Sequence, residues 1–178
     1  MTFEQNTLPC SYFSEKTPLL LENGTSINEL TVAYESYGKL NKNKSNAIIV
    51  CHALSGDQFL ASKNPITNKD GWWDRMVGPG KPIDTDRYFV ICANVLGGCI
   101  GSTGPTSIDP KSNEAYGLNF PVITIADMVN AQIRLINHLG IEKLLSVIGG
   151  SMGGMQDLEW AASYPDRLLS AIPIATSS

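Results

Sequence analysis

The hydrophobic residues of the chain gather in short runs that polar, glycine-rich stretches separate. Residues 47–51, 87–95 and 144–148 are apolar and rich in branched side chains, and turn-forming residues bound them. Runs of this length and composition predict buried strands. Residues 168–175 form a further strand candidate, although Pro173 puts its pairing in doubt because proline lacks the N–H that a sheet ladder uses.

Residues 124–140 follow a different pattern, which predicts a helix. Thr124 is a capping residue with Asp127 three positions later, and Gly140 is a typical stop. Between them, apolar residues recur at helical spacing: Ile125, Met128, Val129, Ile133, Ile136 and Leu139. We interpret His138, in the last turn, as a cation favoured at a helix C-terminus rather than as a catalyst. Residues 155–162 resume the helical spacing and predict a second helix.

The N-terminal region has a weaker pattern. Residues 1–17 are polar and are expected to form an extended arm or a first edge strand. Residues 18–21 and 27–37 flank an Asn23-Gly24 turn signal and predict an antiparallel hairpin. Strands that alternate with long connections and helices indicate an α/β fold. We therefore expect a mainly parallel sheet with flanking helices and an N-terminal antiparallel hairpin.

Polar or glycine-rich loops follow the strand candidates, where α/β sheets form their sites. Residues 52–57 follow the first apolar run and residues 96–105 follow the second. The second loop lacks the lysine and the glycine spacing of phosphate-binding motifs, so we expect it to line the site instead. The irregular connection of residues 58–85 is long enough to be functional or a lid, and we expect Trp72 or Trp73 to anchor it to the core.

The third apolar run ends in Gly149-Gly150-Ser151-Met152-Gly153, which matches the G-x-S-x-G elbow. Such a strand-to-helix turn strains its central residue and needs small neighbours, which Gly149, Gly153 and Gly154 provide. The turn would expose the Ser151 hydroxyl and place the Met152 N–H at a helix N-terminus, facing a developing oxyanion. Ser151 is therefore a candidate nucleophile; the alternative is an ordinary serine in a glycine-rich turn.

A serine nucleophile needs a base, and the base needs an orienting carboxylate. In this fold the order along the chain is serine, acid, histidine, yet His52 and His138 both precede Ser151. Three acidic residues follow the serine too closely to be the usual acid: Asp157, Glu159 and Asp166. We infer that the acid and the base belong to a C-terminal part absent from this chain, which should be inactive alone.

Composition limits the possible classes of protein. The chain has 178 residues, of which 43% are hydrophobic, enough for one globular domain or the leading part of one. A net charge of −4 with scattered basic residues argues against a nucleic-acid partner. We find no export signal and no membrane-length apolar run. Four cysteines without a C-x-x-C pair suit the cytoplasm: Cys10, Cys51, Cys92 and Cys99.

Four blocks of the sequence resemble homoserine O-acetyltransferase. They are HALSGD (residues 52–57), GPGKPIDTDRYFV (78–90), NVLGGC with GSTGP (94–99 and 101–105), and GGSMGGMQ with LEW (149–156 and 158–160). The similarity runs from about Leu30 onward, and the family is roughly twice as long as this chain. The resemblance thus implies an α/β-hydrolase fold, with residues 1–178 as the N-terminal portion of a single domain. The family's C-terminal part and helical lid would be absent.

The resemblance also implies a ping-pong reaction of methionine biosynthesis. Ser151 would take the acetyl group from acetyl-CoA and pass it to the hydroxyl of L-homoserine, while the backbone N–H groups of Leu54 and Met152 hold the oxyanion. His52 would shape the oxyanion loop and not act as base. Acetyl-CoA would be a substrate, and neither a bound cofactor nor a metal is implied. The full-length family implies a homodimer, and the residues that bind the substrates are not identified.

Several alternatives remain open. Relatives in this superfamily use succinyl-CoA or accept serine, and Ser55 stands where threonine is common. A serine hydrolase would use water as the acceptor; the block at residues 97–105, which generic esterases do not need, favours the acyltransferase. A non-catalytic fragment that serves as a binding module is the third possibility.

Overall fold

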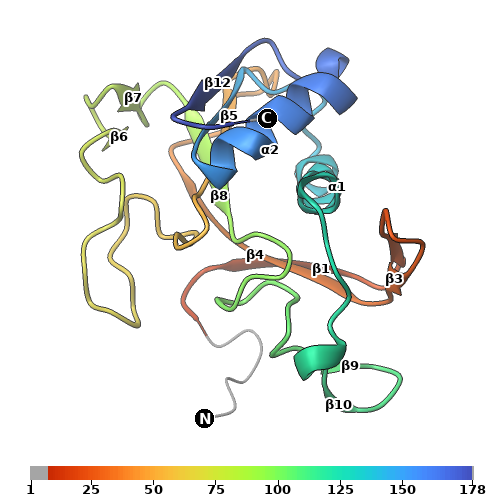
Figure 1. Ribbon diagram of the computed structural model, residues 1–178. Coiled ribbons are helices and arrows are strands. Elements are labelled where there is room, and N and C mark those ends of the chain that lie inside the picture. Colours follow the sequence, from red (N-terminus) through yellow and green to blue (C-terminus); the bar gives the residue numbers. More distant parts are fainter. Residues whose placement is uncertain (1–7, 178) are drawn as a thin grey trace.

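The computed structural model describes residues 8–177, and its centre is a six-stranded sheet in the order β1-β4-β8-β5-β11-β12 (Figure 1). The strands β8, β5, β11 and β12 are parallel, whereas β4 runs antiparallel to β8 and β1 antiparallel to β4. The expected α/β architecture with a mainly parallel sheet is confirmed. In chain order the strands are Ser11–Glu15 (β1), Leu30–Tyr37 (β4), Ala47–Cys51 (β5), Phe89–Ala93 (β8), Ser146–Gly150 (β11) and Ala171–Ile174 (β12).

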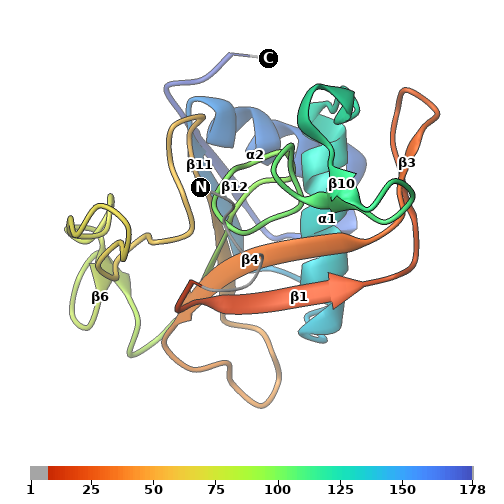
Figure 2. The ribbon, with the colours of Figure 1, turned by 90° about the horizontal axis from the view of Figure 1, so that it is seen from below.

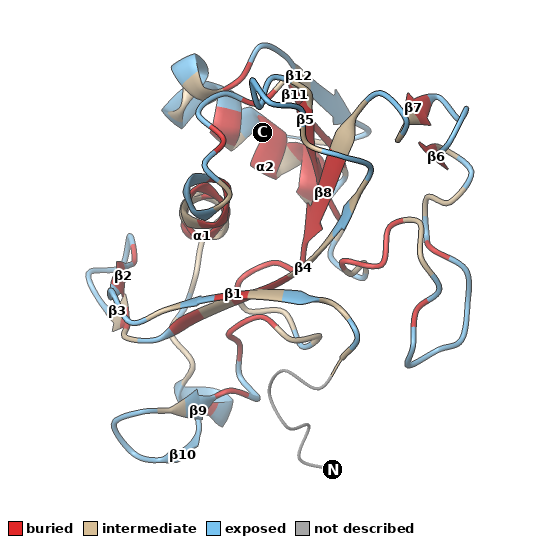
Figure 3. Cartoon of the chain, turned by 180° about the vertical axis from the view of Figure 1, so that it is seen from behind, coloured by how far each residue is buried: buried red, intermediate tan, exposed pale blue. Residues whose placement is uncertain are grey.

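The sheet is covered on both faces by different parts of the chain. One face packs against the helices α1 (Ile125–His138) and α2 (Met152–Ser163). The other face packs against the connection that follows β5 (Figure 3). In β5, Ile49 belongs to the helix side, and Ile48 and Val50 belong to the other. A parallel strand covered on both faces needs apolar residues at every position, which explains the continuous run of β5.

The connection of residues 58–85 is irregular but ordered. It contains the two-residue parallel pair β6 (Val77–Gly78) and β7 (Ile83–Asp84). Trp73 packs against the second core cluster, which confirms the expected anchor, and Trp72 stacks on it with ring centroids 5.6 Å apart. A covering segment of this size replaces the helix that usually protects this face of a parallel sheet.

The N-terminal hairpin is shorter than expected. The pair β2 (Leu19–Leu20) and β3 (Ser26–Ile27) closes around Gly24, which has a φ of 82°. The expectation that residues 27–37 continue this hairpin is wrong, because a new strand begins at Leu30. This strand lies beside β1 (Figure 2) and also pairs with β8. The edge-strand alternative for residues 1–17 is correct for Ser11–Glu15, while residues 1–7 lie outside the described part.

The strands around the elbow begin later than the apolar pattern predicts. The pattern predicts a strand over residues 144–148, whereas β11 runs from Ser146 to Gly150. Leu144 forms only an isolated bridge with Leu168. Pro173 keeps its place in β12 because that strand is at the edge of the sheet. The carbonyl groups of Ser170 and Ile174 face β11, so the proline nitrogen between them faces the open side.

The helix α1 begins at the predicted cap. The Thr124 hydroxyl accepts a hydrogen bond from the Asp127 N–H (3.2 Å), and the Asp127 carboxylate accepts one from the Thr124 N–H (2.9 Å). The helix ends at His138, two residues before Gly140, which has a φ of 68°. The remaining short elements are β9 (Ile108–Asp109), β10 (Glu114–Ala115) and the 3-10 turns Gly117–Asn119 and Pro165–Arg167.

Candidate active site

Ser151 lies on the turn between β11 and α2, as the motif predicts. Its φ is 57° and its ψ is −123°, a conformation that residues other than glycine adopt at a cost of about 1–3 kcal/mol. The backbone is held from both sides. The Ser151 N–H donates to the Ile174 carbonyl (3.0 Å), and the Ser151 carbonyl accepts from the Gly154 N–H (2.9 Å) and the Thr176 hydroxyl (2.7 Å). These contacts keep the strained serine in place, with its side chain exposed.

The glycines around Ser151 differ in what they contribute. A Cβ atom on Gly153 would stand 2.1 Å from the Cys51 carbonyl oxygen, and one on Gly149 would stand 2.5 Å from the Gly153 carbonyl. Both clashes involve backbone, so only glycine lets α2 approach β5 and β11 this closely. At Gly150 the nearest atom would be 3.8 Å away. The expectation that Gly149 and Gly153 provide room is confirmed, and Gly154 does so against Thr176.

The two residues proposed for the oxyanion hole face the same pocket. Met152 is the first residue of α2, where backbone N–H groups have no partner within the helix. Leu54 lies in the loop after β5, and 81% of its side chain is exposed. Both line a pocket of about 200 Å³, together with residues that follow β5 and β8. The remaining lining residues are His52, Gly56, Asn94, Val95, Leu96, Gly97, Gly98, Cys99, Ile100, Ile123 and Met128.

This pocket brings together the carboxyl ends of β5, β8 and β11, where the sequence predicts a site. The glycine-rich loop contributes residues 96–100, so its expected position beside the site is confirmed. The pocket is mostly apolar, which would strengthen a hydrogen bond from a backbone N–H to a charge that develops there. The arrangement suits the stabilisation of an oxyanion next to Ser151.

His52 is locked between two backbone groups. It is 1% exposed, its Nδ1 is 2.7 Å from the Ala53 carbonyl oxygen, and its Nε2 accepts the Val95 N–H at 3.2 Å. These partners require a neutral ring with the proton on Nδ1. Burial lowers the pKa of His52 from its ordinary value and therefore favours the neutral form. The ring links the loops after β5 and β8, which fits the shaping role and leaves no nitrogen available to Ser151.

Asp57 and Trp72 hold the far end of the same loop, and neither role was found from the sequence. The Asp57 carboxylate accepts from the Phe59 N–H (2.8 Å) and the Asn64 amide (2.6 Å). Its carbonyl accepts the indole N–H of Trp72 at 2.9 Å. The signal available in the sequence was an aspartate directly after a Ser-Gly turn, which is a common cap of a following loop. The loop that carries Leu54 is therefore fixed at both ends.

A buried polar cluster lies behind the turn and was also missed. The Trp160 indole donates to the Gln132 amide oxygen (2.8 Å), and the Gln132 amide donates to the Gln156 oxygen (2.6 Å). The Gln156 amide in turn donates to the Met152 carbonyl at 3.2 Å, so the cluster connects α1 to the first turn of α2. Asp157 lies beside it, fully buried. Polar residues inside a helical pattern read as solvent-facing, and no local signal marks them as buried.

No base for Ser151 is found in the described part of the chain. The chain has two histidines. His52 is locked as described, and His138 packs against Phe13 of β1, with ring centroids 4.9 Å apart, at the opposite edge of the sheet from β12. The position of His138 in the last turn of α1 is as predicted.

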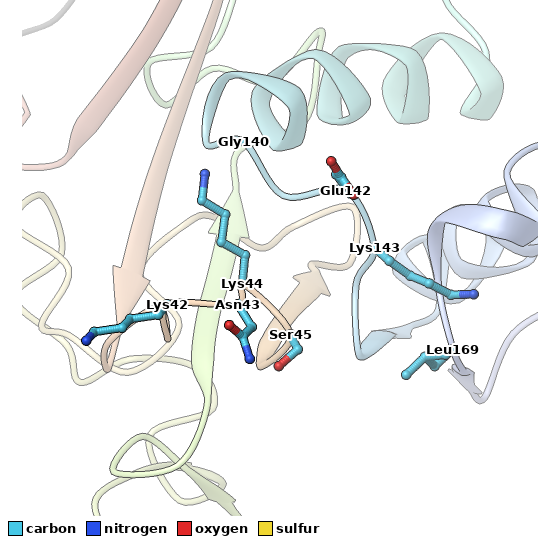
Figure 4. A pocket seen from close by; sticks show the side chains of 8 residues that line it. All are labelled: Lys42, Asn43, Lys44, Ser45, Gly140, Glu142, Lys143 and Leu169. Carbon is cyan, nitrogen blue, oxygen red and sulfur yellow. The ribbon is translucent and has the colours of Figure 1, made fainter.

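A larger pocket of about 470 Å³ lies at the other end of the strands, between the loops that precede β5 and β11. Three lysines line it, but Lys42 and Lys143 point in opposite directions (Figure 4). Lys44 donates to the Leu139 carbonyl (3.1 Å) at the end of α1. The ammonium groups do not converge on one point, so this pocket lacks the geometry of an anion site. Within residues 8–177, no three metal-ligating side chains form a group that could hold a metal ion. Neither described helix is both long and apolar enough to cross a membrane.

Comparison with known proteins agrees with this geometry. Residues 46–178 match the family model of the alpha/beta hydrolase fold. The homoserine O-acetyltransferase of Mesorhizobium japonicum is 58% identical over 98% of the chain, and the match covers 45% of that protein. The crystal structure of homoserine O-acetyltransferase from Bacillus anthracis is 39% identical with a TM-score of 0.87, over 93% of this chain and 46% of that one. Esterase E22 is 41% identical with a TM-score of 0.86, over 94% and 47%.

These matches confirm the resemblance seen in the four sequence blocks. The chain spans about half the length of the curated relatives it matches, and the matched part is their N-terminal half. The mainly parallel central sheet agrees with the fold that the family model describes. The chain belongs to the α/β hydrolase family.

Proposed function

We propose that this chain is the N-terminal part of a homoserine O-acetyltransferase in which Ser151 is the nucleophile. The observation that carries the proposal is Ser151 itself, strained and exposed on the turn before a helix, with Met152 and Leu54 lining the pocket beside it. The curated relatives with this name extend over nearly the whole chain.

In the proposed reaction the Ser151 oxygen attacks the thioester carbonyl of acetyl-CoA. A tetrahedral oxyanion forms, the carbon–sulfur bond breaks, and coenzyme A leaves as the thiol after it takes a proton. The acetyl ester on Ser151 then passes to the side-chain hydroxyl of L-homoserine through a second oxyanion. The N–H groups of Leu54 and Met152 would hold both oxyanions, and each such donor is worth about 10²–10³ in kcat.

The base and its carboxylate belong, in this proposal, to the part of the relatives that the chain does not match. Loss of the histidine from a serine triad costs on the order of 10⁶ in kcat. The 178-residue chain should therefore have almost no activity alone, although it would supply both oxyanion donors. The full-length protein would act in the cytoplasm as a homodimer, in methionine biosynthesis, with no bound cofactor.

An esterase is the second candidate, because esterase E22 matches the chain about as well as the Bacillus anthracis acetyltransferase does. Water would then replace homoserine in the second half-reaction. The turn, the pocket and the oxyanion donors serve both reactions equally. The two functions differ in the acceptor of the acetyl group, so the test must compare transfer to homoserine with hydrolysis.

The test joins this chain to the C-terminal half of the Mesorhizobium japonicum relative and supplies acetyl-CoA with or without L-homoserine. We expect O-acetylhomoserine to form, and Ser151→Ala to abolish it. Hydrolysis of p-nitrophenyl acetate without transfer to homoserine would instead establish the esterase.

Mass spectrometry of the separate 178-residue chain after incubation with acetyl-CoA tests the missing base. No adduct is expected from the folded chain. An acetyl adduct that requires Ser151 would contradict the assignment of the base to the unmatched part.

A further inference from the structure

Asp157 is a buried acid directly behind the Ser151 turn, and the proposed mechanism does not use it. It lies on α2, six positions after Ser151, and its side chain is 0% exposed. Neither of its carboxyl oxygens has a hydrogen-bond partner among the described residues. Its Oδ1 lies 3.0 Å from the point where a Cβ on Gly149 would stand. The carboxyl group therefore fills the space beneath the strand end that leads into Ser151.

The thiol of Cys51, at the end of β5, is an ionisable neighbour of Asp157. Cys51 is 1% exposed, and its Sγ is 3.7 Å from the Gln132 amide oxygen. The strands β11 and β12 consist of uncharged residues. The other charged groups on the elements that pack against α2 are engaged elsewhere.

The contacts of these groups show where each of them points. In α1, Asp127 caps the helix, Arg134 pairs with Glu15, and His138 packs on Phe13. In the turn after α2, Arg167 binds the Glu142 and Ile141 carbonyls and Asp166 is exposed. On α2 itself, Glu159 accepts from Ser163. None of these contacts is made with Asp157.

Burial sets the charge of this acid. It raises the pKa of Asp157 to about 8, because the ionised carboxylate would be desolvated. The Gly149 N–H and the Cys51 thiol lie near it and lower the pKa, but by less than burial raises it. Burial and the neighbouring Asp157 also raise the pKa of Cys51 well above its ordinary value. At neutral pH both groups therefore keep their protons.

We propose that Asp157 is a positioning residue for Ser151: its uncharged carboxyl group fills the space beneath the Gly149–Gly153 turn, and the turn keeps its geometry only while no charge develops there. The catalytic role of the turn rests on the proposed function, but the coupling between Asp157 and the turn does not. An anion at this place would draw the Gly149 N–H or water towards itself, because a bare buried charge is far more costly than a displaced backbone group.

The first test is an NMR titration of the 178-residue chain between pH 6 and 10. We expect the amide resonances of Gly149, Ser151 and Gly153 to move together with a midpoint of about 8. Asp157→Asn, which keeps the shape and removes the charge, should abolish this transition. Asp166→Asn makes the same chemical change at an exposed position and should retain it. A turn that does not titrate, or a transition that persists in Asp157→Asn, would overturn the proposal.

The second test compares thermal unfolding of the wild-type chain and Asp157→Asn across pH. An acid whose pKa is raised in the folded state costs stability as pH rises from about 4, its value in the unfolded chain, to about 8. The Tm advantage of Asp157→Asn should grow by at least roughly 3 °C between pH 5 and 8. A difference that is independent of pH would show a purely structural role and contradict the proposal. Neither test requires acyl transfer, so a chain that titrates as expected, but forms no O-acetylhomoserine when joined to the C-terminal half of the Mesorhizobium japonicum relative, would count against the proposed function alone.

Discussion

The two sides of Ser151 differ in how completely the chain encloses them. On the side of β5 and β8, the loops are fixed by His52 and Asp57, and the pocket beside Met152 is formed. On the side of β12 the sheet is open, and the apolar side chains of Ile172 and Ile174 are 46% and 40% exposed. The groups that would stabilise negative charge thus come from the loop after β5, which lies far before Ser151 in the sequence, and from the first residue of α2. No base for Ser151 is found among residues 8–177, so under the proposed function these two tasks fall to separate stretches of sequence.

The largest expected effect comes from the closest packing on the side of β5 and β8. Gly153→Ala would place a Cβ 2.1 Å from the Cys51 carbonyl oxygen, and neither backbone can move without separating α2 from β5. We expect a loss of more than about 3 kcal/mol in the free energy of unfolding, measured by urea denaturation. Gly150→Ala is the matched control, since its Cβ would have 3.8 Å of space, and it should cost less than about 1 kcal/mol. Equal losses at both positions would refute the close approach.

The next effect concerns pH and the locked histidine. Because burial lowers the pKa of His52 in the folded state, the unfolded chain binds its proton first as pH falls below about 6.5. Stability contributed by the neutral ring is therefore present above that pH and is lost below it, with a slope of up to about 1.4 kcal/mol per pH unit. Denaturation curves between pH 5.5 and 7 measure the slope. His52→Gln should flatten it; a slope that is unchanged in this variant would contradict the assignment to His52.

Trp72 tests how firmly the oxyanion loop is fixed at its far end. Trp72→Phe keeps an aromatic ring against Trp73 and removes the hydrogen bond to the Asp57 carbonyl. Because that carbonyl can turn to solvent, we expect a loss of about 1 kcal/mol in the free energy of unfolding. Faster amide exchange at Leu54 would accompany it. Unchanged exchange in the variant would show that the loop is held without the indole hydrogen bond.

The smallest effect on stability is expected at the open edge. Ile172→Lys should leave the free energy of unfolding within about 0.5 kcal/mol, because the side chain is already half-exposed. The variant should still lower self-association of the 178-residue chain, since a charge on an edge strand opposes pairing with another copy. Sedimentation velocity measures this, and Ile66→Lys, at an exposed position outside the sheet, is the control. A wild-type chain that remains monomeric at high concentration would contradict the premise that the open edge self-associates.

The sequence predicts the features that depend on local pattern. The run of β5, the capping box of α1 and the elbow at Ser151 each need only a few consecutive residues, and all three lie where expected. The resemblance of the four blocks then supplies the α/β-hydrolase fold. The boundary of residues 1–178 as part of a single domain, and the roles of Leu54 and Met152, stay predictions.

The features that the sequence did not predict depend on contacts between distant segments. Whether residues 27–37 continue a hairpin or begin a new strand is decided by β1 and β8, which pair with Leu30–Tyr37 from either side. The buried positions of Gln132 and Asp157 depend on packing between segments that are distant in the chain. A glutamine and an aspartate within a helical pattern carry no mark of the partner that will cover them.

The order of the strands has a consequence for synthesis of the chain on the ribosome. The neighbours of β5 in the sheet are β8 and β11, and both are made after it. β8 begins about 38 residues after β5 ends, which corresponds to roughly 2–8 s of translation. During that interval the most apolar strand of the sheet, Ala47–Cys51, has emerged without either of its partners. The nascent chain therefore exposes an apolar segment early in synthesis, and slowing translation after residue 51 would lengthen that exposure.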